Sequence, residues 1–500
     1  MVKIKKVICY LLLVVVLGVS SFSLVSCAKN EQKKYSKGLS TYSIQAKLSS
    51  DMKVSATENV TFVNRTGQAL NEICFHLYPR AFREGASFKP YTSLTLASCF
   101  PNGISYGNIE ISKVSVNEKQ VNTNLSGEDE DILQIDLDSP LENKKSIKVS
   151  IDFSLIIPNA THRFGYYNGN INLGNWYPIL CYFSDGKFDK SPYYSTGDPF
   201  CSEIANYDIS ISYPKEYNIF STGEIETSEI NGEIQAKITA KAVRDFALNF
   251  SNNSAKTETM VGGTRIVYVG YNSDENINKY LDISAKATEY FSKTFGNYPY
   301  STLTIVKTPF IYGGMEYPNI VFISDSIDDE DEYLKVIVHE IAHQWWYAVV
   351  GNNEVTEAWL DESLAEYSTA LFFENNSSYG ISYDDLIKNA VASYTLYVDV
   401  IKTLRGEVNT KMNLRVNEYQ NDYEYSYMVY VKGVIMFDEL KNAVGEAKLI
   451  NGLKKYYKDN KFKIASKQQF LNAFRFACHK DLDKFFEGFL TGESIISSLS

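Results

Sequence analysis

The spacing of apolar residues changes once along this chain, near residue 256, and this change constrains the fold most. Before it, short segments alternate apolar and polar residues, as in Tyr42–Leu48 and Ile147–Phe153, with Asn, Gly, Ser and Pro between them. Such alternation is typical of strands that have one buried and one solvated face. We therefore predict an all-β, mostly antiparallel N-terminal domain over residues 41–255.

After this point the spacing becomes mainly helical. Residues 277–295 carry apolar side chains every three or four positions and are followed by Gly296, which is the pattern of an amphipathic helix with a glycine stop. Short strand-like runs lie on either side of this helix, and beyond Asp328 the helical spacing continues nearly to the end. Strands followed by helices predict an α+β domain over residues 256–500 that is mainly helical in its second half.

The first residues indicate export from the cytoplasm. A cluster of lysines precedes an apolar run from Val7 to about Val19, and the stretch closes with Leu-Val-Ser-Cys at Cys27. This order is typical of a secretory signal peptide, and its ending resembles the bacterial lipobox, in which the cysteine is lipidated. We expect residues 1–27 to be a lipoprotein signal peptide, residues 28–40 a tether, and the mature chain to be anchored outside the cytoplasm by lipid on Cys27. An uncleaved membrane anchor is the alternative.

The net charge bears on the possible partners, and the cysteines bear on disulfide bonding. The net charge is −11, and there is no basic run outside the N-terminus, so a nucleic-acid partner is not expected. The cysteines after Cys27 are odd in number, widely spaced and without a CxxC pair. We predict buried free thiols, with a pairing of Cys181 and Cys201 as the alternative.

The stretch HEIAHQWW, residues 339–346, carries the chemistry. His339 and His343 are four residues apart, so on a helix they share one face, with Glu340 beside them. Two imidazoles placed in this way can bind one zinc ion, and the glutamate can take a proton from zinc-bound water. A catalytic zinc ion needs a third protein ligand, and Glu362, which eighteen intervening residues separate from His343, can supply it from a second helix. An ordinary helix-surface glutamate is the alternative for Glu362.

Three motifs together resemble the aminopeptidase N family of zinc metallopeptidases, whose catalytic domain is thermolysin-like. The first is HEIAH followed, after eighteen residues, by the glutamate of WLDES. The second is GGMEY at Gly313–Tyr317, which is similar to the family's Gly-x-Met-Glu-Asn, and the third is YVKG at Tyr430–Gly433, which matches its Tyr-x-Lys-Gly. The resemblance implies one zinc ion per chain, with these roles: metal ligands His339, His343 and Glu362; general base Glu340; oxyanion donor Tyr430.

The resemblance also implies what such an enzyme cuts. It places the substrate at Gly313, Gly314, Met315 and Glu316, where the glutamate would hold the free α-ammonium group of a peptide and leave only its first bond at the zinc. One position departs from the family, because Tyr317 stands where the family has asparagine, and the sequence shows no match to the family's second amine-binding residue. The expected function is a zinc-dependent metalloaminopeptidase that removes N-terminal amino acids from peptides by attack of zinc-bound water.

Other functions remain open at this point. A zinc endopeptidase or a peptidase of narrow specificity could use the same site, and a peptide-binding surface lipoprotein without activity is the alternative from another class. The presence of both Glu340 and Tyr430 argues against the last, because a silent site needs neither a base nor an oxyanion donor. Glu366 lies one helical turn after Glu362 and could either orient a ligand histidine or face solvent. The sequence carries no signal for oligomeric state.

Overall fold

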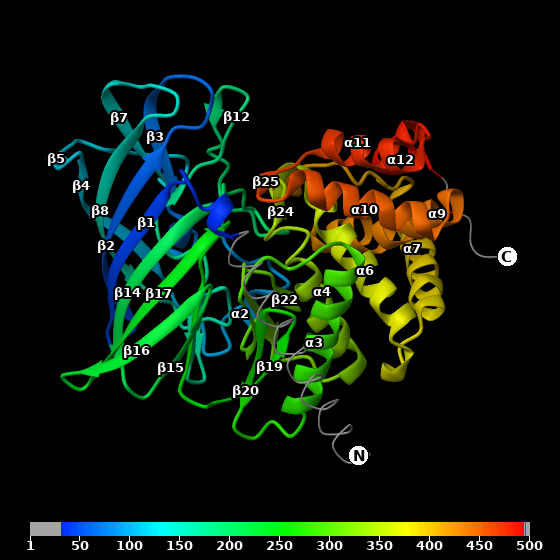
Figure 1. Cartoon of the computed structure of the whole chain (residues 1–500), viewed down its shortest axis with the longest axis horizontal. Coiled ribbons are helices and arrows are strands. Elements are labelled where there is room, and N and C mark those ends of the chain that lie inside the picture. Colours follow the sequence, from blue (N-terminus) through cyan, green and yellow to red (C-terminus); the bar gives the residue numbers. More distant parts are fainter. Residues whose placement is uncertain (1–31, 495, 497–500) are drawn as a thin grey trace, which may run out of the picture.

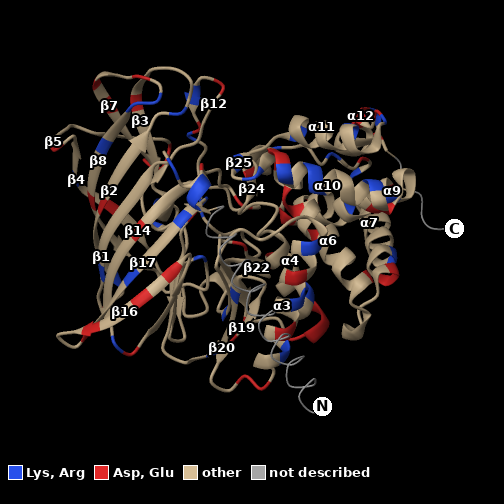
Figure 2. Ribbon diagram, in the orientation of Figure 1, with Lys and Arg blue, Asp and Glu red and all other residues tan. Residues whose placement is uncertain are grey.

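The computed structural model describes residues 32–494 and 496 (Figure 1), so Cys27 and the expected signal peptide lie outside the described residues. Strands fill the N-terminal half of the described chain, and helices fill most of the C-terminal half. No helix within this described range is long and apolar enough to cross a membrane. Acidic and basic side chains are interspersed over strands and helices (Figure 2).

A large sheet supports the N-terminal domain. Its strand order is β16-β17-β14-β1-β2-β8-β4-β5, and all neighbours are antiparallel except β1 and β14. The alternation seen in the sequence sets its two faces, because every second residue from Val54 to Phe62 is buried. The strands are β1 (Thr41–Leu48), β2 (Lys53–Val63), β4 (Asn108–Val116), β5 (Lys119–Gln120), β8 (Ser146–Ile156), β14 (Ala205–Pro214), β16 (Glu224–Ile230) and β17 (Glu233–Val243).

Two smaller sheets and a hairpin complete this domain. One sheet has the order β11-β3-β7-β6 and the other β15-β18-β10-β9, while β12 (Phe183–Ser184) pairs with β13 (Lys187–Phe188). The loop between β13 and β14 contacts the second domain, where the Thr196 hydroxyl donates to Asp422 at 2.6 Å. The sheet strands are β3 (Leu70–His76), β6 (Asn124–Ser126), β7 (Ile132–Leu141), β9 (Phe164–Tyr167), β10 (Asn170–Leu173), β11 (Ile179–Leu180), β15 (Asn218–Ser221) and β18 (Leu248–Ser251); the short helices are η1 (Tyr78–Phe82) and α2 (Leu96–Cys99).

The second domain begins with a five-stranded sheet of order β19-β20-β21-β23-β22. Its strands are β19 (Ser254–Val261), β20 (Thr264–Tyr271), β21 (Thr302–Thr308), β22 (Gly314–Met315) and β23 (Ile320–Ser324). Helix α3 (Ile277–Thr294) connects the parallel strands β20 and β21. The short strand β22 is antiparallel to β23 and forms the edge of the sheet, so one side of its backbone is free to meet another strand.

Helices make up most of the rest of this domain, as predicted. Helix α4 (Glu330–Ala342) begins at Asp329, whose side chain accepts from the Glu332 N–H, and α6 (Glu362–Asn375) lies against it. The remaining elements are α5 (Glu354–Glu357), η2 (Ala358–Leu360), η3 (Ser377–Tyr379), α7 (Tyr383–Arg405), η4 (Val416–Glu418), α8 (Asp422–Ser426), the π-helix η5 (Tyr427–Val431), α9 (Lys432–Val444), α10 (Glu446–Asn460), α11 (Lys467–Cys478), α12 (Asp483–Leu490), and the paired strands β24 (Val350–Gly351) and β25 (Lys463–Ile464).

A buried arginine joins the two domains. The Arg244 guanidinium, which follows β17, donates to the carbonyl oxygens of Ser202 at 2.7 Å, Tyr347 at 2.9 Å and Lys463 at 3.0 Å. A buried charge is costly unless it is well hydrogen-bonded. We therefore expect these three bonds to hold the two domains together at this seam.

Two further sequence predictions concern features outside the site. Cys74, Cys99, Cys181, Cys201 and Cys478 are free and buried, in agreement with the predicted thiols. Residues 32–35, which belong to the expected tether, are helical, and the Tyr35 ring lies 4.4 Å from the Phe462 ring. This part of the segment therefore packs on the C-terminal domain.

Candidate active site

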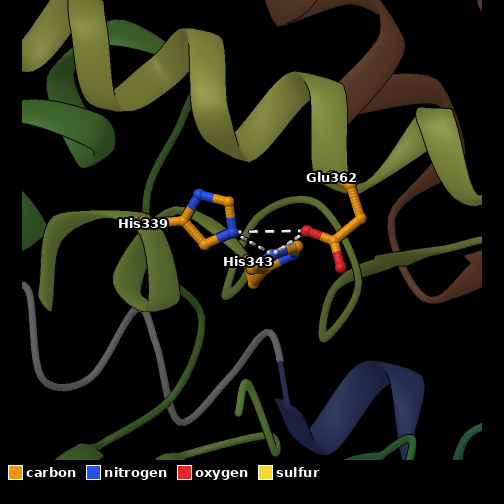
Figure 3. A group of neighbouring side chains, drawn as sticks. All are labelled: His339, His343 and Glu362. Carbon is orange, nitrogen blue, oxygen red and sulfur yellow. Dashed lines mark hydrogen bonds and ion pairs between the residues drawn. The ribbon is translucent and has the colours of Figure 1, made fainter. Parts of the chain in front are cut away.

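The two histidines and Glu362 converge on one point between α4 and α6 (Figure 3). Helix α4 ends at Ala342, and His343 is its C-cap residue, still with helical dihedral angles, so the four-residue spacing keeps both rings on one face. The Nε2 atoms of His339 and His343 are 3.0 Å apart, and Glu362 Oε2 lies 3.2 Å and 3.1 Å from them. Glu362 is the first residue of α6, where Asp361 accepts from its N–H at 2.8 Å.

The outer nitrogen of each imidazole fixes the orientation of its ring. His339 Nδ1 lies 3.0 Å from Glu366 Oε2, and His343 Nδ1 lies 3.0 Å from the carbonyl oxygen of Trp346. Both oxygens are acceptors, so each Nδ1 carries a proton, and each Nε2 faces the centre of the triangle, where loss of its proton would expose a lone pair to a metal ion. Glu366 therefore orients a histidine, which the sequence had left open against a solvent-facing role.

This triangle fits a zinc ion. Tetrahedral zinc with bonds of about 2.0–2.1 Å places its ligand atoms about 3.3–3.4 Å apart, close to the observed separations of 3.0–3.2 Å. Two neutral imidazoles and one carboxylate form the His2Glu set of catalytic zinc sites, which leaves one position for water or substrate. The fit rests on three donor atoms that already point at a common centre.

The charges of the site also favour binding of a cation. Burial lowers the pKa of His343, but the Glu362 carboxylate and then Glu316 outweigh burial and raise that pKa to about 10. Burial opposes ionisation of Glu362, yet the two imidazoles hold its pKa well below the usual range. The carboxylate thus stays ionised and attracts positive charge to the centre, the role that a metal ion would take over.

Glu340 lies beside this triangle without belonging to it. Its side chain is buried, and its Oε2 atom has no hydrogen-bond partner among the described residues. Burial raises its pKa to about 7, against the lowering effect of the two histidines, and a metal cation nearby would lower it. A Cβ atom on Gly314 would lie 2.4 Å from Glu340 Oε1, so this glycine makes room for the glutamate.

The substrate residues predicted at 313–316 are only partly brought together. Gly313, Gly314 and Glu316 line a cleft of about 420 Å³ that also contains the metal triangle. Met315 is buried in β22 and is not among the described residues that line this cleft. Successive side chains of a strand point to opposite faces, which explains why Met315 turns into the core while its neighbours face the cleft.

A carboxylate from the β domain faces Glu316. Asp198 lies in the loop after β13, and carboxylate oxygens of Asp198, Glu316 and Glu362 all lie within 4.8 Å of one another. Arg163 donates to Asp198 Oδ1 at 2.6 Å. Burial first, and then the Asp198 charge, raises the pKa of Glu316 well above its ordinary value; Glu316 Oε1 has no partner within the part of the chain that the structure describes.

Tyr317 points away from these carboxylates. Its hydroxyl donates to Asn175 Oδ1 at 2.8 Å, and its ring covers Gly174 so closely that a Cβ atom there would lie 1.9 Å from the Tyr317 oxygen. Asn175 Nδ2 in turn donates to Asp245 at 2.7 Å. The departure from the family pattern at residue 317 therefore concerns the seam between the domains and leaves Glu316 in the cleft.

Tyr430 borders the cleft from the other side. It belongs to the π-helix η5 and is partly buried, with its ring stacked on His339 at a centroid distance of 5.8 Å. A second tyrosine, Tyr425, lies edge-on to it. Burial, followed by the nearby Glu362 charge, raises the pKa of Tyr430 well above 10.0, so its hydroxyl keeps its proton as a hydrogen-bond donor.

Comparison with known proteins agrees with this geometry. Residues 279–489 match the family model described as the Peptidase family M1 domain. Residues 279–489 are therefore similar to an M1 peptidase domain. This match, together with the aminopeptidases below, confirms the resemblance to the aminopeptidase N family inferred from the three motifs.

The relatives of the M1 domain include aminopeptidases of greater length. The chain is 30% identical over 172 residues to leucine aminopeptidase 2 of Aspergillus fumigatus, covering 33% of this chain and 26% of that protein. It is 30% identical over 193 residues to human aminopeptidase B, covering 36% and 28%. The chain thus spans less than a third of the length of these relatives.

A solved structure matches nearly the whole chain. The M1 zinc metallopeptidase from Deinococcus radiodurans superposes with a TM-score of 0.63 at 14% identity, covering 91% of this chain and 94% of that one. The likeness includes the β domain as well as the M1 domain. It confirms the predicted fold class, an N-terminal β domain followed by an α+β domain.

Several residues of the site were not predicted from the sequence. Asp198 is one, because an acidic residue in a loop resembles any other until the fold brings it opposite Glu316. Gln344 is another: its Nε2 donates to the carbonyl oxygens of Glu316 at 3.3 Å and Tyr317 at 3.2 Å. The sequence signal for Gln344 was its position directly after the metal ligand His343. In the structure its side chain links the end of the helix that carries the histidines to the segment that carries Glu316.

Proposed function

We propose that this chain is a zinc-dependent aminopeptidase that removes N-terminal residues from peptides. The observation that carries the proposal is the pair of carboxylates, Glu316 and Asp198, within 4.8 Å of the metal ligand Glu362. With Arg163 bound to Asp198, this group has one net negative charge when both carboxylates are ionised. One α-ammonium group would neutralise it.

The short distance between the amine site, Glu316 and Asp198, and the metal ligands limits which peptide bond is cut. An α-ammonium group held by Glu316 and Asp198 is one Cα atom away from the first peptide carbonyl, so this carbonyl falls at the metal triangle. Behind Asp198, the Arg163 guanidinium is buried and lies 4.9 Å from the centre of the Phe200 ring. Arg163 and Asp198 both line the cleft, so we expect them to obstruct a longer N-terminal segment.

The edge of the sheet supports the substrate backbone. Strand β22 pairs with β23 on one side only, and Gly313 and Gly314 line the cleft. An extended peptide can add to such an edge as a further antiparallel strand. Gly313 carries no side chain that would hold the peptide away.

The residues of the chain divide the chemistry between them. His339, His343 and Glu362 would hold the zinc ion, which when bound polarises a carbonyl group and lowers the pKa of water. Glu340 takes a proton from the attacking water and returns it to the leaving amine. Tyr430 donates its hydroxyl proton in a hydrogen bond to the carbonyl oxygen as that oxygen becomes negative.

Neutral variants of the two carboxylates test the amine site. Glu316→Gln and Asp198→Asn are each expected to lower kcat/KM for aminoacyl amides by about 10- to 100-fold, because each removes a charge-assisted hydrogen bond in a buried site. The loss should appear mainly in KM. Steady-state kinetics on a substrate with a free α-amine measures it.

Glu332→Gln is the matched control, because Glu332 lines the same cleft but pairs with Lys335. Its kinetics should stay within about twofold of the unmodified enzyme, as expected for an exposed ion pair. An equal loss in all three variants would show that the general acidity of the cleft matters and that the Glu316–Asp198 pair does not bind the amine specifically.

Attachment to the membrane from outside the cytoplasm, through lipid on Cys27, stays a prediction from the first 27 residues. It fits an enzyme that acts on peptides arriving from the surroundings. Fractionation of cells that express a Cys27→Ser variant tests it, since a variant that is processed and retained in membranes like the unmodified chain would contradict it.

A further inference from the structure

Ser363 connects the helix of the metal ligand to the segment that carries Tyr430. It follows Glu362 in the first turn of α6 and is fully buried. Its hydroxyl donates to the carbonyl oxygen of Val429 at 2.6 Å, across 66 positions of sequence. This carbonyl belongs to the peptide group whose nitrogen is that of Tyr430. The bond therefore acts directly on the backbone that aims the tyrosine.

The backbone at this point has an irregular conformation. In the π-helix η5 (Tyr427–Val431), the Lys432 N–H reaches back five residues to the Tyr427 carbonyl. Such one-turn widenings inside helices are frequently found at functional sites. The regular α9 begins directly afterwards, so the orientation of Tyr430 depends on contacts that hold the widened turn in place.

A glycine permits this contact. A Cβ atom on Gly433 would lie 2.3 Å from Ser363 Oγ and 2.5 Å from Ser363 Cβ. The absence of a side chain at Gly433 lets α6 approach the widened turn closely enough for the hydroxyl to reach Val429. This also gives a physical reason for the glycine of the YVKG motif in this chain.

Other buried hydroxyls of the same helix behave differently. Ser368 and Thr369 donate to carbonyl oxygens of α6 itself, those of Leu364 at 2.6 Å and Ala365 at 2.9 Å. Such bonds within a helix are common for serine and threonine. Ser363 instead donates to another element, at the residue before the proposed oxyanion donor.

We propose that Ser363 is a positioning residue for Tyr430: its hydroxyl fixes the Val429–Tyr430 peptide group and thereby aims the phenol at the reacting carbonyl. The inference rests on the proposed function, in which Tyr430 stabilises the oxyanion. In this role Ser363 couples two residues of the site: the metal ligand Glu362, which precedes it, and the oxyanion donor Tyr430.

A double-mutant cycle in the zinc-loaded full chain tests this role. Ser363→Ala is expected to lower kcat about 5- to 10-fold, the effect of losing one buried hydrogen bond, with KM and zinc content unchanged. Tyr430→Phe should lower kcat about 10²- to 10³-fold, as for loss of one oxyanion donor. Adding Ser363→Ala to Tyr430→Phe should cause no further loss, because no hydroxyl remains to be aimed.

Ser284→Ala is the matched control, because Ser284 is equally buried and donates only to its own helix, at the Tyr280 carbonyl. It should leave kcat unchanged even if thermal stability falls. If Ser363→Ala lowers kcat by the same factor with and without the Tyr430 hydroxyl, its role is only structural and the inference fails. If Tyr430→Phe itself keeps full kcat, the assignment of Tyr430 in the proposed function fails instead.

Binding of a transition-state analogue provides a second readout. A phosphonic dipeptide analogue, with a tetrahedral phosphorus in place of the scissile carbonyl, should bind Ser363→Ala about 5- to 10-fold more weakly. The affinity for a simple alkyl amine, which has the ammonium group but no oxygen at the position of the reacting carbonyl, should not change. Equal weakening of both ligands would overturn the positioning role.

Discussion

Replacing Glu340 with glutamine is expected to lower kcat by about 10²- to 10⁴-fold, the usual contribution of a general acid–base residue, while the zinc ion is retained. Glu340 does not belong to the triangle of metal ligands, and the space left by Gly314 also accommodates the isosteric amide. The amide cannot accept the proton of the attacking water. Kinetics on an aminoacyl chromogenic amide, with metal content from atomic absorption, gives both results.

Two outcomes of this experiment would contradict the account. An active Glu340→Gln enzyme would remove the general-base assignment. A variant that has lost its zinc would show that Glu340 supports the metal site, so that the loss of activity says nothing about proton transfer.

Removal of the metal ion is expected to abolish hydrolysis and to lower the melting temperature. Metal bound only by the folded chain stabilises it according to its concentration and affinity. One equivalent of zinc per chain should restore both properties to protein treated with EDTA. The Glu362→Gln variant should not recover at the same zinc concentration, because it lacks the only carboxylate of the triangle formed with His339 and His343.

The Glu366→Gln variant distinguishes the loss of a residue that orients a metal ligand from the loss of a metal ligand itself. Its carboxylate contacts His339 Nδ1 and lies outside the triangle, so we expect zinc affinity to fall about 10- to 100-fold and full activity to return at high zinc. Hydrolysis that survives EDTA treatment of the unmodified enzyme, with its metal removed, would contradict a zinc mechanism.

The parts of the site that the sequence predicted are those set by short-range periodicity or by a motif of fixed spacing. His339 and His343 share a face because the helix repeats every 3.6 residues, and this holds although His343 lies at the very end of α4. Alternating segments predicted strands such as β1 and β8, because successive side chains of a strand point to opposite faces. Glu362 was found through its distance from His343 within a known pattern.

Contacts across the fold could not be predicted in this way. Asp198 meets Glu316 only because the loop after β13 reaches the second domain, and Ser363 meets Val429 only because a turn of helix is widened. Neither residue has a local pattern that marks it. For Tyr317 the sequence suggested a role that the fold does not give it. The tyrosine follows Glu316 directly in the sequence, but its hydroxyl donates to Asn175 in the other domain.

The most direct test of the proposed function compares one peptide with a free N-terminus and the same peptide N-acetylated, each incubated with the zinc-loaded enzyme. Mass spectrometry of the products identifies the bond that is cut. We expect the free peptide to lose its first residue and the acetylated peptide to stay intact, because the acetylated peptide brings no ammonium group to Glu316 and Asp198. Cleavage of the acetylated peptide at internal bonds, at a comparable rate, would show an endopeptidase and contradict it.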